Sequence, residues 1–376
     1  MKKVKLGEIC EIVTGSTPKS SNPNYWNGEY KWITPAEISD DDFIVFDTQR
    51  KITKLGIEET GLKSFPTGTV LLSSRAPIGK VAISGCEMYC NQGFKNFICS
   101  NKINNEYLYY FFKARKNYLN ILGRGATFKE ISKSIVSDIE IFLPTYDIQR
   151  KQVKVLKKID KLIYTRKEQL IEFEYLVKSR FNEMFGDPVL NEMGWDKHAL
   201  KEFGIWKSGG TPKRNEEEFF RGNIPWITSG ELEHKYIEDS FEKITEKAIE
   251  CSSAKIIEKG SLLLGMYDTA GLKSSINTKV ISCNQAIAFA KLDDKITNTI
   301  YVYYVIQNLR STLLNQQRGV RQKNFNLSMI KNISIPLPPL ALQNEFADFV
   351  AQVDKSQFAC EIAIKVWRNS LKFSII

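Results

Sequence analysis

Residues 208–232 read SGGTPKRNEEEFFRGNIPWITSGEL, a Gly-Thr-Pro turn followed by a charged run and then by Ile-Pro-Trp-Ile-Thr. Residues 14–38, TGSTPKSSNPNYWNGEYKWITPAEI, repeat this pattern 194 residues earlier without a gap. The residues common to both copies are, in the first, Gly15, Thr17, Pro18, Lys19, Gly28, Trp32, Ile33, Thr34 and Glu37. Chance would give roughly one or two identities over this length at average composition. Residues 208–232 are therefore the second copy of an internal repeat.

The repetition continues along the chain. Residues 125–149, GATFKEISKSIVSDIEIFLPTYDIQ, match residues 319–343, GVRQKNFNLSMIKNISIPLPPLALQ, at the same offset. Between these blocks, residues 68–83 match residues 260–276 at a slightly smaller offset, as insertions and deletions in loops produce. A repeat of this length is too long for a solenoid unit, so it predicts two copies of a whole domain.

Each copy has the pattern of a mixed α and β domain. Short segments rich in Ile, Val and aromatic residues are bounded by Gly, Pro, Asn or Ser, which is typical of strands. Residues 104–122 and 298–316 carry a broad apolar face and predict amphipathic helices. We therefore expect an α+β fold with two tandem, similar α/β domains, at residues 1–145 and 187–338.

The connectors, residues 146–186 and 339–376, predict two long helices. Residues 148–185 contain neither Pro nor Gly, and Gly-Asp-Pro follows them as a helix stop. Apolar residues recur every seven positions in both connectors, which favours an antiparallel coiled coil and a pseudo-twofold molecule. The alternative is two separate helices, each packed on its own domain. The predicted helix–helix seam consists of Leu156, Ile159, Ile163, Leu170, Phe173, Val177, Phe346, Phe349, Val353 and Trp367, with Cys360 in the same register.

The composition is that of a globular protein able to bury sizeable cores, with 43% hydrophobic and 26% charged residues among 376. We expect no membrane span and no signal peptide, because no long apolar run occurs and MKKVKLGEIC lacks an apolar core. Because the seven cysteines form no Cys-x-x-Cys pair and there are only two histidines, we expect no zinc site. The odd number of cysteines and the lack of a signal peptide point to a reducing cytoplasm. The net charge of +10 suggests a polyanionic partner, most often nucleic acid.

No catalytic, cofactor-binding or metal-binding residues are predicted. Neither a glycine-rich phosphate loop nor a nucleotide fingerprint is present, and PLPPL at 336–340 lacks the flanking residues of a base-methylating motif. The acidic stretch DSFEK at 239–243 has no counterpart in the first copy and is typical of a solvated face. A standalone nuclease or methyltransferase would need such motifs. A protein-interaction scaffold that never contacts DNA stays open as an alternative, and salt-insensitive or absent DNA binding would favour it.

The paired GSTPKS…KWITPAEI and GGTPKR…PWITSGEL blocks, GATFKEIS…IFLP, SRFNEMFGDP and GWDKHALKEFGIWKSGGTP together resemble the specificity subunit of type I restriction–modification systems. The resemblance covers essentially the whole chain. It implies two target-recognition domains, each reading one half of a bipartite sequence in double-stranded DNA. It also implies that the spacer helices fix the distance between half-sites and dock two adenine methyltransferase subunits. Restriction subunits would join the full complex, and S-adenosylmethionine, ATP and Mg²⁺ would bind to the partners rather than to this chain.

One departure from the family pattern concerns the start of the chain. Some members begin with a conserved helix, whereas here the first recognition domain is expected almost at once, so the central and C-terminal helices would be the pairing ones. The polar loops, in which the two copies differ, are the expected DNA contacts. The candidates are Lys19, Ser20, Asn22, Arg75, Lys80, Lys95, Arg124 and Lys129 in the first domain, and Lys213, Arg214, Arg221, Tyr267, Lys273, Arg318, Arg321 and Lys323 in the second.

Overall fold

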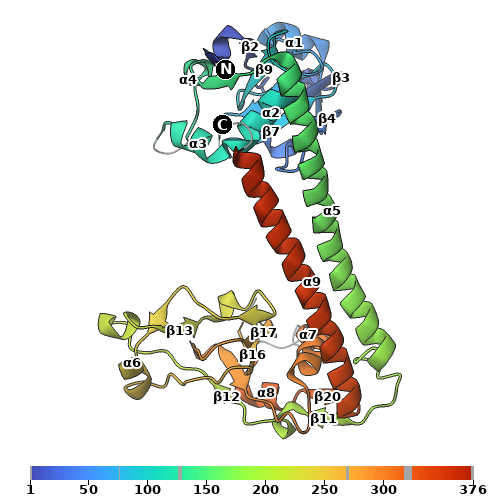
Figure 1. Ribbon diagram of the computed structural model, residues 1–376, viewed down its shortest axis with the longest axis vertical. Coiled ribbons are helices and arrows are strands. Elements are labelled where there is room, and N and C mark those ends of the chain that lie inside the picture. The colour runs from blue at the N-terminus through green and yellow to red at the C-terminus, as the bar shows by residue number, and fades with distance from the viewer. Residues whose placement is uncertain (1, 76, 126–128, 268–270, 317–323, 374–376) are drawn as a thin grey trace. The chain divides into compact units, whose positions relative to one another are not determined.

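The computed structural model describes residues 2–75, 77–125, 129–267, 271–316 and 324–373 (Figure 1). The chain forms two compact units, residues 1–169 with 360–376, and residues 170–359. The division falls inside two long helices, α5 (Tyr146–Phe185) and α9 (Leu340–Phe373). Each unit therefore contains part of both helices. Neither helix contains a Pro or Gly, the two residues that most strongly destabilise a helix interior.

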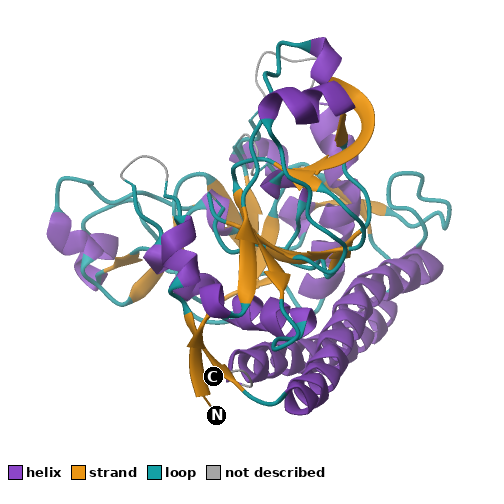
Figure 2. Ribbon diagram, turned by 90° about the horizontal axis from the view of Figure 1, so that it is seen from above, coloured by secondary structure: helices purple, strands orange, loops and turns teal. Residues whose placement is uncertain are grey.

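The described part of the first unit holds sheets of five, three and two strands, in the orders β2-β9-β6-β7-β4, β5-β3-β8 and β1-β10. Figure 2 distinguishes these strands from the helices and loops. Their bounds are β1 Lys2–Lys5, β2 Cys10–Val13, β3 Trp26–Ile33, β4 Ile44–Val45, β5 Arg50–Ile52, β6 Val70–Ser73, β7 Val81–Ser84, β8 Tyr89–Cys90, β9 Phe94–Cys99 and β10 Glu140–Leu143.

The described part of the second unit repeats this topology strand for strand, in the orders β12-β19-β16-β17-β14, β15-β13-β18 and β11-β20. In both units the pairs β4–β7 and β3–β8, or β14–β17 and β13–β18, are parallel. The bounds are β11 Lys197–Ala199, β12 Lys207–Ser208, β13 Ile224–Ile227, β14 Tyr236–Ile237, β15 Lys243–Ile244, β16 Leu262–Gly265, β17 Ser274–Asn277, β18 Ser282–Cys283, β19 Ile287–Ala290 and β20 Ser334–Pro336. The prediction of two similar tandem α/β domains is confirmed.

The central strand β6 shows why these segments are almost continuously apolar. Successive side chains of a strand point to opposite faces of the sheet. Val70 and Leu72 lie in the core formed with α2 (Asn105–Ala114), whereas Leu71 lies in a second core with Phe94. The strand is buried on both faces, which removes the apolar–polar alternation of a half-exposed strand.

The helix predicted at 104–122 is instead two helices, α2 and α3 (Lys116–Leu122). Arg115 leaves the α-helical region, with φ −109° and ψ 19°, and its amide bonds to Phe112 with the tighter spacing of a 3₁₀ turn. The counterpart in the second unit, α7 (Thr299–Gln316), is unbroken. The remaining helices are α1 Lys54–Thr60, α4 Lys133–Ser137, α6 Glu246–Glu250 and α8 Leu327–Lys331, with 3₁₀ turns at Leu6–Glu8, Pro23–Tyr25, Pro35–Glu37, Leu200–Glu202, Glu217–Phe220 and Ser229–Glu231.

A buried glutamine anchors the start of each long helix. In the first unit, Gln149 accepts a hydrogen bond from the Asn104 amide (2.8 Å) and donates one to the Pro144 carbonyl (3.0 Å). Gln343 makes the same bonds in the second unit, to Asn298 and Pro338. Each glutamine therefore ties a long helix both to the strand that precedes it and to the helix packed on the sheet.

In the second unit the end of α5 packs against the beginning of α9, so the two helices are antiparallel there (Figure 1). The rings of Phe181 and Phe185 lie 5.5 and 5.4 Å from that of Phe346, and Arg180 pairs with Glu345 at 2.9 Å. In the first unit the Cys360 thiol lies 3.9 Å from the Gln169 side-chain oxygen.

The predicted seam residues differ in burial, and several of them belong to the cores of the two units. Leu156, Ile163, Val177, Phe346, Val353 and Cys360 are buried, and Ile159, Leu170, Phe173, Phe349 and Trp367 are half-buried. Leu156 belongs to the core of the first unit's sheet and α2, and Val177 belongs to that of the second unit. Each helix is thus part of the core of the domains it contacts.

Candidate nucleic-acid interface

The Trp-Ile-Thr-x-x-Glu motif of each copy builds a support for a loop. Thr34 and Glu37 form a capping box around a 3₁₀ turn, and Thr228 and Glu231 form the same box in the second unit. The second carboxylate oxygen of each glutamate then accepts a backbone amide from the loop after β4 or β14. These amides belong to Gln49 (2.7 Å) and Phe241 (2.9 Å). The framework fixes the backbone of both loops while leaving their side chains free to differ.

A second support joins the Gly-Thr-Pro turn to the Asn-Gln pair found in both copies. The Thr17 hydroxyl donates to the Gln92 side-chain oxygen at 2.6 Å. Thr211 and Gln285 make the corresponding bond in the second unit. The residues that recur in the sequence are therefore those that position loops, and the residues that differ lie on the loops themselves.

In the first unit the predicted contacts divide by exposure. Lys19, Ser20, Arg75, Arg124 and Lys129 are exposed, Asn22 and Lys80 are half-buried, and Lys95 is buried. Asn22 has a local role, because its side chain caps a 3₁₀ turn by accepting the Asn24 amide at 3.1 Å. The Lys80 ammonium donates to the Pro35 carbonyl at 3.1 Å and so supports the capping-box turn.

Glu130 gathers three of these predicted residues. Arg75 binds one carboxylate oxygen at 2.9 Å and Lys95 the other at 3.3 Å, while the backbone of Arg124 pairs with that of Glu130. Burial alone would raise the pKa of Glu130, but the hydrogen bonds from Lys95 and Arg75 outweigh it and hold the pKa below its usual range.

Lys95 requires a correction as a candidate for direct DNA contact. Its side chain is only 7% exposed, and its ammonium also donates to the Ser74 hydroxyl at 3.2 Å. A buried lysine needs a carboxylate partner, and Glu130 provides it. In this structure Lys95 supports the loop that carries Arg124 and does not reach the surface.

In the second unit the two arginines of the divergent stretch are ion-paired. Arg214 binds Glu242 through two hydrogen bonds of 2.5 and 3.0 Å, which raises its pKa, and Arg221 binds Glu217 at 2.7 Å. Lys213 and Tyr267 are exposed and Lys273 is half-buried. Arg318, Arg321 and Lys323 lie outside the described residues.

Two exposed residues that the sequence did not single out lie on the same loops and strands. Phe241, whose own backbone amide is held by Glu231, is 94% exposed. Arg50 lies with its guanidinium carbon 3.5 Å from the centre of the Trp26 ring. The repeat in the sequence could have pointed to both residues. Thr53 and Thr245 lie 192 residues apart, and each caps a helix. An alignment with that local offset places Arg50 opposite Glu242.

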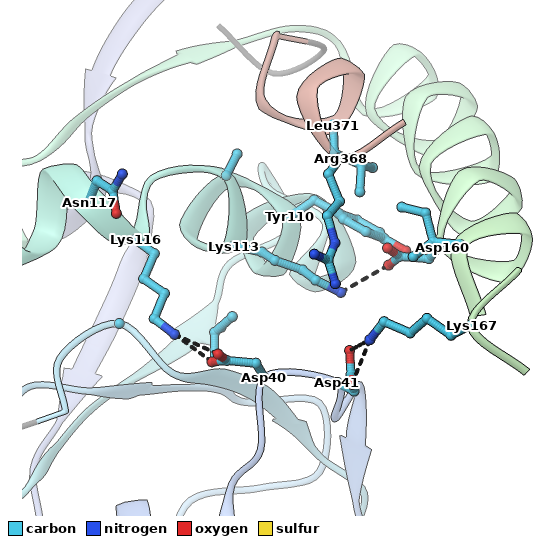
Figure 3. Close-up of a pocket in the computed structure, with 14 residues that line it drawn as sticks. Asp40, Asp41, Tyr110, Lys113, Lys116, Asn117, Asp160, Lys167, Arg368 and Leu371 are labelled. Atoms are coloured by element: carbon cyan, nitrogen blue, oxygen red, sulfur yellow. Dashed lines mark hydrogen bonds and ion pairs between the residues drawn. The ribbon is translucent and has the colours of Figure 1, made fainter. Parts of the chain in front are cut away.

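A pocket of about 440 Å³ lies in the first unit, between α2, α3, α5 and the end of α9 (Figure 3). Its lysines pair with aspartates: Lys116 with Asp40, Lys167 with Asp41, and Lys113 with Asp160. The hydrogen bond from Lys167 holds the pKa of Asp41 below its usual value, and Arg368 adds to the effect. These charges neutralise one another across the joint between the domain and its helices, so the pocket has the character of a structural contact.

Metal binding and membrane insertion find no support in the part of the chain that the structure describes. No group of three or more His, Cys, Asp or Glu side chains there could hold a metal ion. Among the described helices, none has the length and apolar character that a membrane crossing requires. The seven cysteines are free; Cys10, Cys90, Cys283 and Cys360 are buried, Cys86 and Cys99 are half-buried, and Cys251 is exposed.

A duplicated α+β domain, with a shared framework and different polar loops on each copy, defines a protein with two related recognition sites. A family model described as the type I restriction modification DNA specificity domain matches residues 1–174 and again residues 192–366. The chain belongs to this family and is a type I restriction–modification specificity subunit with two recognition domains. In this class of protein the chain that recognises DNA is not catalytic, and catalysis is carried out by partner subunits.

Individual relatives agree with this assignment. The chain is 29% identical over 366 residues to the type I restriction enzyme MjaIX specificity subunit of Methanocaldococcus jannaschii, covering 92% of this chain and 85% of that one. It is 26% identical over 218 residues to the EcoR124I/EcoR124II specificity subunit of Escherichia coli, covering 54% and 52%. The fold resembles the crystal structure of the S subunit from M. genitalium, with a TM-score of 0.60, 14% identity, and 100% and 96% of the two chains covered.

Proposed function

We propose that each unit reads one half of a bipartite sequence in double-stranded DNA. The observation that carries the proposal is the pair of equivalent supports, Glu37 and Glu231, which hold loops of the same backbone position and different sequence. Identical supports with different loop side chains are what two half-sites of different sequence require. The net charge of +10 favours association with the phosphate backbone.

The long helices are the proposed site of subunit assembly. On α5, the part within the first unit exposes Val155, Leu162 and Tyr164, and the part within the second exposes Ile171 and Tyr175. Apolar side chains on a helix already packed by its other face are typical of protein–protein contacts. We propose that these faces dock two methyltransferase subunits, that restriction subunits join the full complex, and that the helix length sets the spacing of the half-sites.

The proposal assigns S-adenosylmethionine, ATP and Mg²⁺ to the partner subunits. It places the complex in the cytoplasm, where the host DNA lies. A standalone enzyme would show Mg²⁺- or S-adenosylmethionine-dependent activity in the isolated chain, and we expect none.

Sequencing of methylated adenines in the host genome tests the proposal directly. We expect one bipartite motif with a fixed unread spacer. Exchange of residues 186–338 for the second domain of another family member should change only one half of that motif. If both halves change, the two domains do not read separately.

The spacer can be tested independently of the half-sites. Insertion of one helical turn near Lys167 should lengthen the unread spacer and leave both half-sites unchanged. An unchanged spacer would show that the helix length does not set the spacing.

A further inference from the structure

Both units hold an arginine guanidinium over a pair of aromatic rings. In the first unit the Trp26 and Trp32 rings lie 5.0 Å apart, nearly perpendicular, and the Arg50 guanidinium carbon lies 3.5 and 5.3 Å from their centres. In the second unit Phe220 and Trp226 form the equivalent pair at 6.0 Å. The Arg214 guanidinium carbon lies 4.7 and 4.9 Å from them.

The two arginines reach this place from different parts of the chain. Arg50 is on β5, directly opposite Trp32 in the strand register. The residue opposite Trp226 is Glu242, whose carbonyl accepts the Trp226 amide at 3.0 Å. Arg214 instead comes from the loop after Thr-Pro-Lys, at the position that Ser20 occupies in the first unit. The guanidinium therefore lies over the same pair of rings in both units, although it belongs to a different segment of the chain in each.

The two guanidinium groups differ in what their N–H donors bind. The Glu242 carboxylate occupies the fork of Arg214 with two hydrogen bonds. Arg50 is exposed, and the interactions found for its side chain among the described residues are those with the Trp26 and Trp32 rings. The first unit therefore presents an oriented, uncompensated guanidinium, and the second presents a neutralised one.

The Arg50 side chain is also held by rings that cannot turn away. Trp26 and Trp32 are buried, and their indole N–H groups donate to the backbone carbonyls of Lys19 and Ser16. A guanidinium stacked on a fixed ring loses little freedom when it binds, so its planar fork is prepared for a ligand with two acceptors side by side. In DNA that arrangement is the O6 and N7 edge of guanine in the major groove.

We propose that Arg50 reads a guanine in the first half-site, and that the Arg214–Glu242 pair is the closed form of the same position in the second. This inference rests on the proposed function. Packing on the rings alone is the competing explanation, since a cation over an exposed aromatic face contributes modestly to stability.

The test uses the full chain in complex with its methyltransferase partner, and duplexes carrying the motif found by sequencing. Arg50→Lys keeps the positive charge but lacks the planar pair of N–H donors. Arg50→Met lacks the charge but keeps an aliphatic side chain that can pack on Trp26. We expect both variants to melt within a few degrees of the parent and to lose about tenfold in discrimination at one base pair of the first half-site. Discrimination at the second half-site should stay the same. The matched control is Lys54→Met, at an exposed lysine of α1.

Two results would overturn the proposal. An equal loss for every sequence, with a smaller dependence on salt, would make Arg50 a phosphate contact. No change in discrimination in either variant would leave the arginine with packing alone. If the unmodified complex methylated no bipartite sequence, the proposed function would fail and this inference with it.

A second experiment introduces the residues of the first unit at the equivalent positions of the second unit. The double variant Arg214→Ser with Glu242→Arg gives the second unit the Ser20 and Arg50 arrangement of the first. Because the guanidinium again covers Phe220 and Trp226, the variant should keep its melting temperature. We expect a new guanine preference of several-fold in the second half-site and none in the first. A folded, active double variant with unchanged preference would contradict the proposal.

Discussion

Asp160 and Asp354 occupy the same position on the two long helices, eleven residues after the buried glutamines Gln149 and Gln343. Each holds a lysine of its own unit: Lys113 of α2 lies 3.1 Å from Asp160, and Lys235, which precedes β14, lies 2.5 Å from Asp354. The aspartate has been kept while the lysine comes from different elements. Each long helix is therefore fastened to its recognition domain at two points, by a glutamine and by an aspartate.

Replacement of Asp354 by Asn should destabilise the second unit. The Asp354 and Lys235 side chains are only 21% and 16% exposed, and Asp354 also accepts the Tyr236 hydroxyl at 3.0 Å. Removal of the charge leaves the half-buried Lys235 ammonium without a carboxylate partner, although it still donates to the Tyr304 hydroxyl at 3.2 Å. We expect a loss of about 1–3 kcal/mol in the free energy of unfolding, measured by urea denaturation. Asp348→Asn, at an exposed position of the same helix, should change it by less than about 0.5 kcal/mol.

The ring cluster at the end of α5 gives a second prediction. Phe346 is fully buried against Phe181, Phe185 and Tyr304. Phe346→Ala should cost about 3–5 kcal/mol, because it removes apolar burial and leaves a cavity. Phe358→Ala, at a 63% exposed position on α9, is the matched control for stability. Equal effects of the two substitutions in thermal unfolding would mean that the cluster is not part of the core.

The duplication could be predicted from the sequence because the residues that recur are those that make the structural hydrogen bonds in each copy. Thr34, Glu37 and their partners in the second copy recur because each capping box needs that spacing. The same logic extends to the glutamines and aspartates of the long helices, which lie in or just beyond the second repeated block. These framework residues either bond to near neighbours in the sequence or recur at a constant offset between the two copies. A single sequence is therefore enough to identify them.

The ion pairs of the candidate site could not be predicted in this way. Lys95 and Glu130 are 35 residues apart, and Arg214 and Glu242 are 28 apart. Neither ion pair recurs as an ion pair in the described part of the other copy. Whether a lysine such as Lys95 faces solvent depends on a partner that only the folded chain brings near. The break at Arg115 was missed because the apolar face continues on both sides of it.

The Glu130 network predicts a dependence of stability on pH. The pKa of this carboxyl is lowered in the folded chain from its usual 4.5, so its contribution to stability is complete above about pH 4.5. It is lost as the pH falls through the lowered value. Glu130→Gln should remove this part of the acid sensitivity, seen as a flatter plot of melting temperature against pH between about 3 and 5. Glu58→Gln, at a surface pair with Lys54, should leave the plot unchanged. A parallel plot for Glu130→Gln would show that Lys95 and Arg75 do not stabilise the charged form.

Phe241, the most exposed aromatic residue among those whose burial the structure describes, gives the last prediction. Phe241 is 94% exposed although its backbone amide is fixed by Glu231, so the fold carries the ring into solvent on an anchored backbone. An apolar ring held in this way can contact a thymine methyl group or wedge against a base step. Phe241→Ala should weaken binding of the complex to its duplex by about tenfold, a loss of about 1.4 kcal/mol, with an unchanged melting temperature. Gln49→Ala is the matched variant in the first unit, because the Gln49 amide is held by Glu37 in the same way. Its effect should appear at the first half-site only, in binding assays with mismatched duplexes, and that of Phe241→Ala at the second only. Equal effects at both half-sites would mean that the two loops do not face separate halves of the sequence.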